Sequence, residues 1–163
     1  MAINEKDLLV FLLSTLRRNA QRATRIFREI AKAAQDSDVR EALQARVLVS
    51  NKINATLDEA FNLIGEIPIK TNTPLQDIFV EEFRRELAEI ESPEARRLFL
   101  LVKTNDVIQR RIGEYAALIT VAEITANHGI RVLLESCLAD NVAFIETTLR
   151  LMLEPMHPKP AAA

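Results

Sequence analysis

Three long apolar stretches of the sequence are each interrupted near the midpoint by polar residues, seven in all, whose side chains could bind a ligand or take part in a reaction. We call this set the polar layer, and it consists of Ser50, Asn51, Asn54, Asn105, Gln109, Asp140 and Asn141. Side chains that meet at one height inside a helical bundle commonly build metal or ligand sites. However, neutral amides bring no charge to offset the desolvation of a divalent metal ion. We therefore predict no catalytic residue, no metal and no cofactor here, and expect the amides to hydrogen-bond in the core and fix the helix register.

Two alternatives for this region remain open. The polar layer could form a small pocket for an unidentified small molecule, or Asp140 could join Glu114 or Glu135 in a non-standard acidic metal site, with Glu123 as a further acid. The two histidines, His128 and His157, fall in a predicted turn and in the tail. A further group of charged residues, Asp106, Arg110 and Arg111, is interpreted as a solvated or interface cluster.

The elements that must position these residues are helices, because the apolar residues recur alternately three and four positions apart. The first stripe is Leu9, Leu13, Leu16, Ala20, Ala23, Phe27, Ile30 and Ala34. An average period of about 3.5 residues places such a set on one helix face. Similar stripes, broken by the polar layer, run from Leu43 to Ile64, from Leu98 to Ala126 and from Leu134 to Met152. The sequence therefore predicts an all-α protein.

Capping signals divide the chain into five predicted helices, at about 5–34, 38–64, 74–91, 93–126 and 130–153. Asn4 and Thr73 are suitable N-caps, Ser92-Pro93-Glu94 restarts the chain as a helix, and Gly65 is a candidate left-handed C-cap. Two helical hairpins joined by a long connection are typical of an antiparallel four-helix bundle with one crossover. We expect one domain over 1–154, with an additional short amphipathic helix in the crossover that lies across the bundle or at a subunit contact. The proline-rich segment 155–163 is predicted to be a disordered tail.

Composition limits the classes of partner. The chain has 163 residues with 21 Lys and Arg against 23 Asp and Glu, which gives no general attraction to nucleic acid or to an anionic membrane. No apolar run approaches the length of a membrane span, so we expect a cytoplasmic protein. The single cysteine, Cys137, is predicted to be a buried hydrophobe. The segments 98–102 and 116–124 are apolar around much of the helix, and this favours a homodimer, with the identity of any other protein partner unknown.

Three segments carry a family resemblance. Residues 30–43 read IAKAAQDSDVREAL, residues 115–123 read YAALITVAE ahead of a glycine-containing turn, and residues 133–138 read LLESCL. In order and spacing the chain resembles the ferritin-like YciE/YciF family of bacterial stress-associated proteins. This resemblance implies a ferritin-like four-helix bundle that commonly forms dimers, and it implies a di-iron carboxylate centre.

The positions that match the family's metal ligands carry other residue types in this chain. They fall at Ala20, at Leu48 with Asn51, at Ile108 with Arg111, and at Asn141 beside Asp140. These groups cannot bind Fe(II), and an arginine would repel it. We therefore predict a non-enzymatic bundle that has lost its di-iron site and has a structural or protein-interaction role linked to stress response. The alternatives are a ferroxidase or oxidoreductase type of metal protein with an acidic site, and a small-molecule-binding module.

Overall fold

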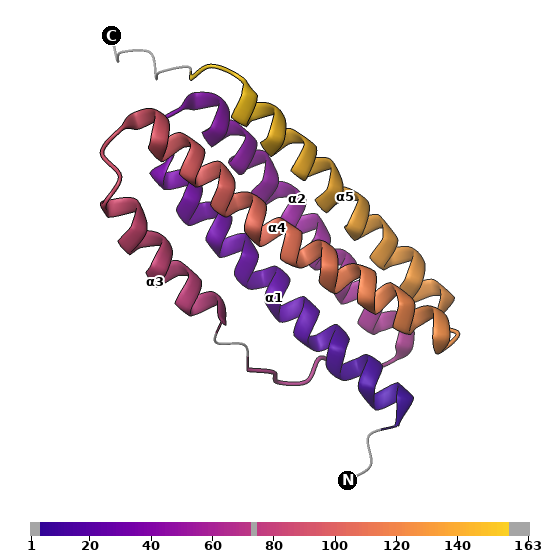
Figure 1. The fold of residues 1–163 in the computed structure, drawn as a ribbon. Helices are drawn as coiled ribbons and strands as arrows, with labels where there is room; N and C mark the ends of the chain where they lie inside the picture. Colours follow the sequence, from indigo (N-terminus) through magenta and orange to yellow (C-terminus); the bar gives the residue numbers. More distant parts are fainter. Residues whose placement is uncertain (1–3, 73–74, 157–163) are drawn as a thin grey trace.

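A computed structural model describes residues 4–72 and 75–156 and shows five helices (Figure 1). They are α1 (Glu5–Ala33), α2 (Ser37–Ile64), α3 (Leu75–Ala88), α4 (Pro93–Ile124) and α5 (His128–Leu153). No strand occurs in these two ranges, so the all-α prediction is confirmed. The predicted boundaries agree to within three residues, the largest difference being the end of α3. The proposed N-cap at Thr73 and most of the predicted tail lie outside the described residues.

The four long helices pack as an antiparallel bundle. Helix α1 lies against α2 and α4, and α5 lies against the same two helices from the opposite corner. The α1–α2 and α4–α5 pairs are hairpins, and the connection between them contains α3, which packs on the outside of α1 and α4 (Figure 1). The predicted connectivity with one long crossover is therefore confirmed, and it is the one that ferritin-like bundles use.

Local capping interactions explain where the helices begin and end. The Asn4 side chain accepts a hydrogen bond from the Asp7 backbone N–H at 2.9 Å, and the Asp7 carboxylate accepts one from the Asn4 N–H, which forms a capping box. At the start of α4 the Ser92 hydroxyl accepts a hydrogen bond from the Ala95 backbone N–H at 3.3 Å. Gly65 ends α2 with φ of 66°, a left-handed conformation that glycine adopts without a steric cost. The chain therefore turns at the expected positions.

The core consists of two hydrophobic clusters, one toward each end of the bundle. Every member of the predicted α1 stripe is buried, and Leu13, Phe27 and Ile30 are fully inaccessible. Helix α3 adds Phe83 and Leu87 to one cluster. None of the helices within the described residues is long and apolar enough to cross a membrane.

Most of the predicted stripes on α2 and α4 are buried, but the structure differs from the prediction near two arginines. On α4, Leu98 is 44% exposed although it was predicted to lie in the core, while its neighbour Arg97 is buried. On α2, Arg46 is buried and Val47 is only partly buried. The stripe prediction was wrong at Leu98, and it missed Arg46 and Arg97 because it treated arginine as a surface residue, whereas Val47 does pack against the core.

Candidate functional site

A small cavity lies at the centre of the bundle and is lined by side chains from all four long helices. Its volume is about 10 Å³, which is about the space that one water molecule needs. The lining residues are Ala20 and Ala23 from α1, Arg46, Ser50 and Ile53 from α2, Arg111 and Tyr115 from α4, and Asn141 from α5. We call it the central cavity. Because Ala20 and Ala23 belong to different hydrophobic clusters, the cavity marks the level where the two clusters meet.

Arg46 brings a buried positive charge to the central cavity. Arg46 is only 3% exposed. Its Nη2 donates a hydrogen bond to Asn141 Oδ1 at 2.8 Å. Asn141 is held in turn, because its Nδ2 donates to the Cys137 carbonyl at 2.7 Å. The guanidinium carbon lies 5.2 Å from the ring centre of Phe27 and 5.5 Å from that of Phe144, within the range of cation–π attraction.

Arg111 brings a second buried charge from α4. It is 3% exposed, and its Nη2 contacts Glu114 Oε1 at 2.7 Å. The same oxygen accepts a hydrogen bond from Asn19 Nδ2 at 3.2 Å. Arg111 is therefore paired with a carboxylate, whereas Arg46 contacts no carboxylate of the described residues. The prediction that Arg111 belongs to a solvated or interface cluster was wrong.

Several nitrogens of these two side chains have no hydrogen-bond partner among the described residues. They are Nε and Nη1 of Arg46 and Nε and Nη1 of Arg111. The nearby acid Asp140 acts on Arg46 through its charge, but its carboxylate already contacts Lys52 Nζ at 3.0 Å. A buried charge with unmet donors is costly, because the group has lost its hydration without full compensation.

Burial changes the acid–base behaviour around the cavity. It lowers the pKa of Arg46 to about 10 and also lowers that of Arg111, yet a group with a pKa of about 10 stays protonated at neutral pH. Burial raises the pKa of Glu114 in opposition to the attraction of Arg111, and it raises the pKa values of Tyr115 and Cys137. The phenol and the thiol are consequently neutral near pH 7, so they cannot balance the charge of Arg46.

The members of the predicted polar layer occupy three kinds of environment. Ser50 and Asn141 are buried and line the central cavity. Asn54 and Asn105 are partly buried and contact Thr24 and Thr148 at 3.3 and 3.5 Å, respectively.

Asn51 and Gln109 are exposed, which corrects the prediction that they lie in the core. The half-buried Asp140 lies beside the cavity without lining it. The partner of the central amide is an arginine rather than another amide.

The positions matched to the family's metal ligands also divide into groups. Ala20, Arg111 and Asn141 line the central cavity, whereas Ile108 is fully buried in the adjacent hydrophobic cluster. On α2, Leu48 is 71% exposed and Asn51 is exposed as well. The residues that α2 places at this level are instead Arg46, Ser50 and Ile53.

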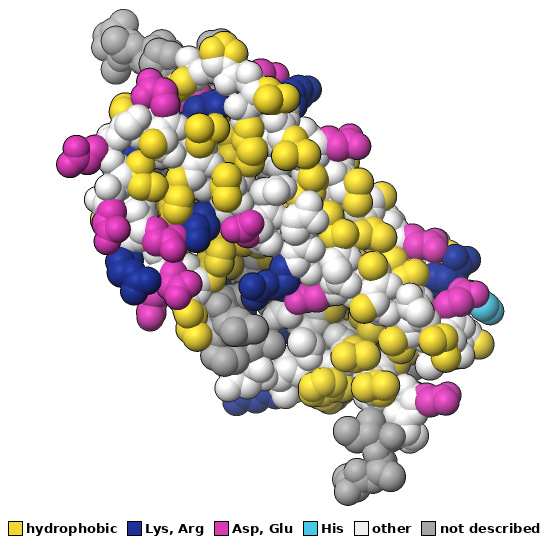
Figure 2. Space-filling model, viewed as in Figure 1, with side chains coloured by type: hydrophobic (Ala, Val, Ile, Leu, Met, Phe, Trp, Pro, Cys, Tyr) yellow, Lys and Arg dark blue, Asp and Glu magenta, His cyan; other side chains and the backbone are white. Residues whose placement is uncertain are grey.

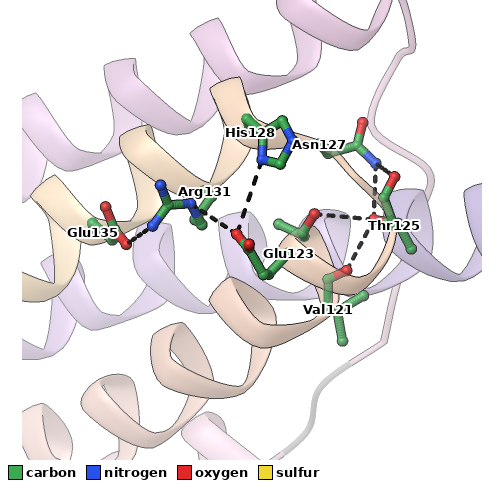
Figure 3. Close-up of polar contacts among 8 residues, drawn as sticks. Val121, Glu123, Thr125, Asn127, His128, Arg131 and Glu135 are labelled. Atoms are coloured by element: carbon green, nitrogen blue, oxygen red, sulfur yellow. Dashed lines mark hydrogen bonds and ion pairs between the residues drawn. The ribbon is translucent and has the colours of Figure 1, made fainter.

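The alternative acidic metal site is not assembled. Glu123 and Glu135 lie near the turn between α4 and α5, where both contact Arg131, at 2.9 and 2.7 Å (Figure 3). His128 is 4.0 Å from Glu123 in the same group (Figure 3). Across residues 4–72 and 75–156, no group of three or more His, Cys, Asp or Glu side chains could hold a metal ion.

The residues of the central cavity do not fit a di-iron centre. Such a centre needs several anionic carboxylates with imidazole, whereas this level of the bundle presents two guanidinium groups, alanine side chains and an amide. Like charges would repel the metal at close range in a site of low dielectric constant. A typical organic ligand is excluded too, because such ligands occupy pockets of about 300–1,000 Å³.

The fold and its centre define the class of protein: an antiparallel four-helix bundle with one long crossover and two buried arginines at the central cavity. The chain belongs to the family described as Domain of unknown function (DUF892), whose model matches residues 5–157. No curated protein sequence matches significantly.

Solved structures that are similar over most of the chain include the following two. One is the stress protein YciF of E. coli, with 20% sequence identity, a TM-score of 0.85, and coverage of 93% of this chain and 96% of that one. The other is YcfI of Rhodopseudomonas palustris, a proposed structural protein, with 22% identity, a TM-score of 0.84, and coverage of 90% and 93%. The resemblance to the YciE/YciF family is thereby confirmed. At these identities the likeness shows the fold alone.

Proposed function

We propose that this protein is a non-enzymatic helical bundle with a structural or protein-binding role, and that its core has lost the di-iron site which the family resemblance implies. The observation that carries the proposal is the presence of Arg46 and Arg111 at the central cavity. The E. coli relative is called a stress protein and the R. palustris relative a proposed structural protein. We extend both descriptions to this chain as a structural role linked to stress response.

The physical support comes from charge. Arg111 is neutralised by Glu114, but Arg46 is not in contact with any carboxylate among the described residues. A bundle that binds iron here would need to expel or neutralise that charge and supply several anionic ligands. Neither the neutral Ala20 nor the amide of Asn141 can do so, and the nearest acids are already paired with lysine or arginine.

The test is elemental analysis of protein expressed with iron and manganese supplied. We expect metal well below one equivalent per chain, with no change in Glu114→Gln or Asp140→Ala. Glu146→Gln, which alters an exposed acid on α5, is the matched control. Near-stoichiometric iron, manganese or zinc that is lost in Glu114→Gln or Asp140→Ala but kept in Glu146→Gln would overturn the proposal.

We also propose that the protein forms a homodimer through α4 and α5. Figure 2 shows hydrophobic side chains along these two helices, whereas charged side chains gather over α3. Leu98, Val102 and Leu149 are 44–47% exposed, and Leu153 is 89% exposed. They lie toward one end of the bundle, because Arg97 beside Leu98 donates to the Leu151 carbonyl. Exposed apolar groups of this kind favour association.

Sedimentation equilibrium measures this directly. We expect a dimer that weakens when Leu98 and Leu149 are both replaced by Glu. The paired replacement of two apolar residues on other helices, Leu48 and Ile78, should leave the association unchanged. A strictly monomeric wild-type protein at high concentration would refute the dimer.

A further inference from the structure

We propose that the central cavity binds one small monovalent anion of the halide class, chloride being the abundant example, between the guanidinium groups of Arg46 and Arg111. Both side chains line the cavity, and both residues are only 3% exposed. The inference goes beyond the proposed structural role, since a non-enzymatic bundle could equally keep a dry or water-filled centre.

The first argument is the charge at this level of the bundle. Arg111 and Glu114 cancel each other at 2.7 Å, which leaves the positive charge of Arg46. Asp140, an acid whose charge attracts Arg46, is itself paired with Lys52 at 3.0 Å. Because Tyr115 and Cys137 remain protonated near pH 7, one bound anion would neutralise the centre.

The second argument is the set of unused donors. Nε and Nη1 of each arginine make no hydrogen bond to the described part of the chain. Arginine donates from five N–H groups in a fixed plane and accepts none, so the natural occupant of a space between two such groups is an acceptor with negative charge. The rings of Phe27 and Phe144 lie 5.2 and 5.5 Å from the Arg46 guanidinium carbon and stabilise its charge, but they leave Nε and Nη1 without a hydrogen bond to the described residues.

The third argument is size. A cavity of about 10 Å³ admits a water-sized sphere, and a small outward movement of flexible arginine side chains would admit a halide. Phosphate, sulfate and organic anions are too large for it. The alanine side chains of Ala20 and Ala23 provide the space on the α1 side. The cavity should therefore distinguish halides from larger anions.

Thermal unfolding in sodium chloride or bromide, compared with sodium gluconate at the same ionic strength, tests the proposal. A ligand that binds only the folded state raises the melting temperature as its concentration rises. At a halide concentration tenfold above Kd we expect a rise of about 3–6 °C for a chain of this size. General salt effects are removed by comparison with Arg110→Met, which alters an exposed arginine beside Arg111 and should respond as the wild type does.

Arg46→Met is the first diagnostic variant, because methionine keeps much of the apolar stem and removes the charge. Its melting temperature should be independent of the choice between halide and gluconate. The second variant, Ser50→Asp, places a fixed carboxylate on a buried residue that lines the cavity. It should melt higher than the wild type in gluconate and lose the halide response, so it decides the question even if Arg46→Met fails to fold.

A crystal grown in sodium bromide supplies the direct observation. We expect an anomalous peak in the central cavity between the two guanidinium groups. The proposal is overturned if the cavity holds only water under these conditions. It is also overturned if Ser50→Asp destabilises the protein and keeps the wild-type halide response. Neither readout depends on metal content. The anion site can therefore be refuted while the proposed function stands, and the proposed function can be refuted while the anion site stands.

Discussion

Replacing Asn141 with alanine should destabilise the protein more than the loss of an ordinary amide. Asn141 is fully buried and accepts the one hydrogen bond that Arg46 makes to the described part of the chain. Removing the acceptor leaves the side chain of a buried cation without a hydrogen bond to the described residues, a loss of about 1–3 kcal/mol or more for charged groups. The bond from Nδ2 to the Cys137 carbonyl is lost as well. We therefore expect the free energy of unfolding to fall by about 3 kcal/mol.

The same substitution should cost much less when the cation is absent. In an Arg46→Met background the amide has no charged donor to satisfy, so Asn141→Ala should cost only about 1 kcal/mol. The difference gives a coupling energy of about 2 kcal/mol, within the range measured for residues in contact. Asn51→Ala is the matched control, because Asn51 is an exposed amide on a bundle helix, and its change should stay within about 0.5 kcal/mol.

Urea unfolding followed by helix circular dichroism measures the four proteins of this cycle and the Asn51→Ala control at one fixed chloride concentration. With a slope of about 2 kcal/mol per molar urea, Asn141→Ala should move the midpoint down by about 1.5 M. The slope itself should stay constant, since the surface exposed on unfolding is nearly unchanged. If Asn141→Ala costs the same in both backgrounds, to within about 0.5 kcal/mol, the arginine and the amide are not coupled and the reasoning fails.

Two further predictions concern other buried groups. Arg97 contacts Asp36 at 3.0 Å, and the two side chains are 6% and 2% exposed. Because Arg97→Met would leave a buried carboxylate unpaired, it should lower the free energy of unfolding by about 3–5 kcal/mol in the same urea assay. A loss below about 1 kcal/mol would contradict this. Burial raises the pKa of Cys137 from 9.0 to about 12, so native protein at pH 8 should resist a thiol reagent that labels it rapidly in urea. Because the folded state favours the neutral thiol, the contribution of Cys137 to stability is complete below pH 9 and is lost as the pH rises toward 12. The stability of Cys137→Ser should not show this loss.

Helix α1 shows how much of the fold the sequence could predict. Every position of its stripe carries an apolar residue, and every one is buried. The caps at Asn4 and Gly65 were also predicted, because each depends on residues within one turn. Local periodicity and local hydrogen bonds therefore determine the helices and their order. The burial of Cys137 was predicted for the same reason, since it stands in an apolar stretch.

The centre could not be predicted in the same way, because its key residues violate the usual rule that charged side chains are exposed. Arg46 continues a spacing of three and four with Leu43, Ser50 and Ile53, and Arg111 does so with Ile108 and Tyr115, all buried residues. This spacing was the sequence feature that could have indicated the burial of both arginines. What makes the burial of Arg46 tolerable is Asn141, which lies 95 positions further along the chain. Likewise, the partner of Arg97 is 61 positions away.

Stability alone does not explain why arginines occupy the central cavity. Buried ionic groups can often be replaced by apolar residues of similar volume without loss, so methionine or leucine would fill the same space at lower cost. The buried charge must therefore have a role that an apolar centre could not perform. One candidate is helix register, because Arg46 joins α2 to α5 by a single directional bond; the other is the bound anion. The two explanations can be distinguished by experiment. Register depends on Asn141 and not on salt, whereas anion binding depends on halide concentration and survives in variants that keep both arginines and add no carboxylate to the cavity.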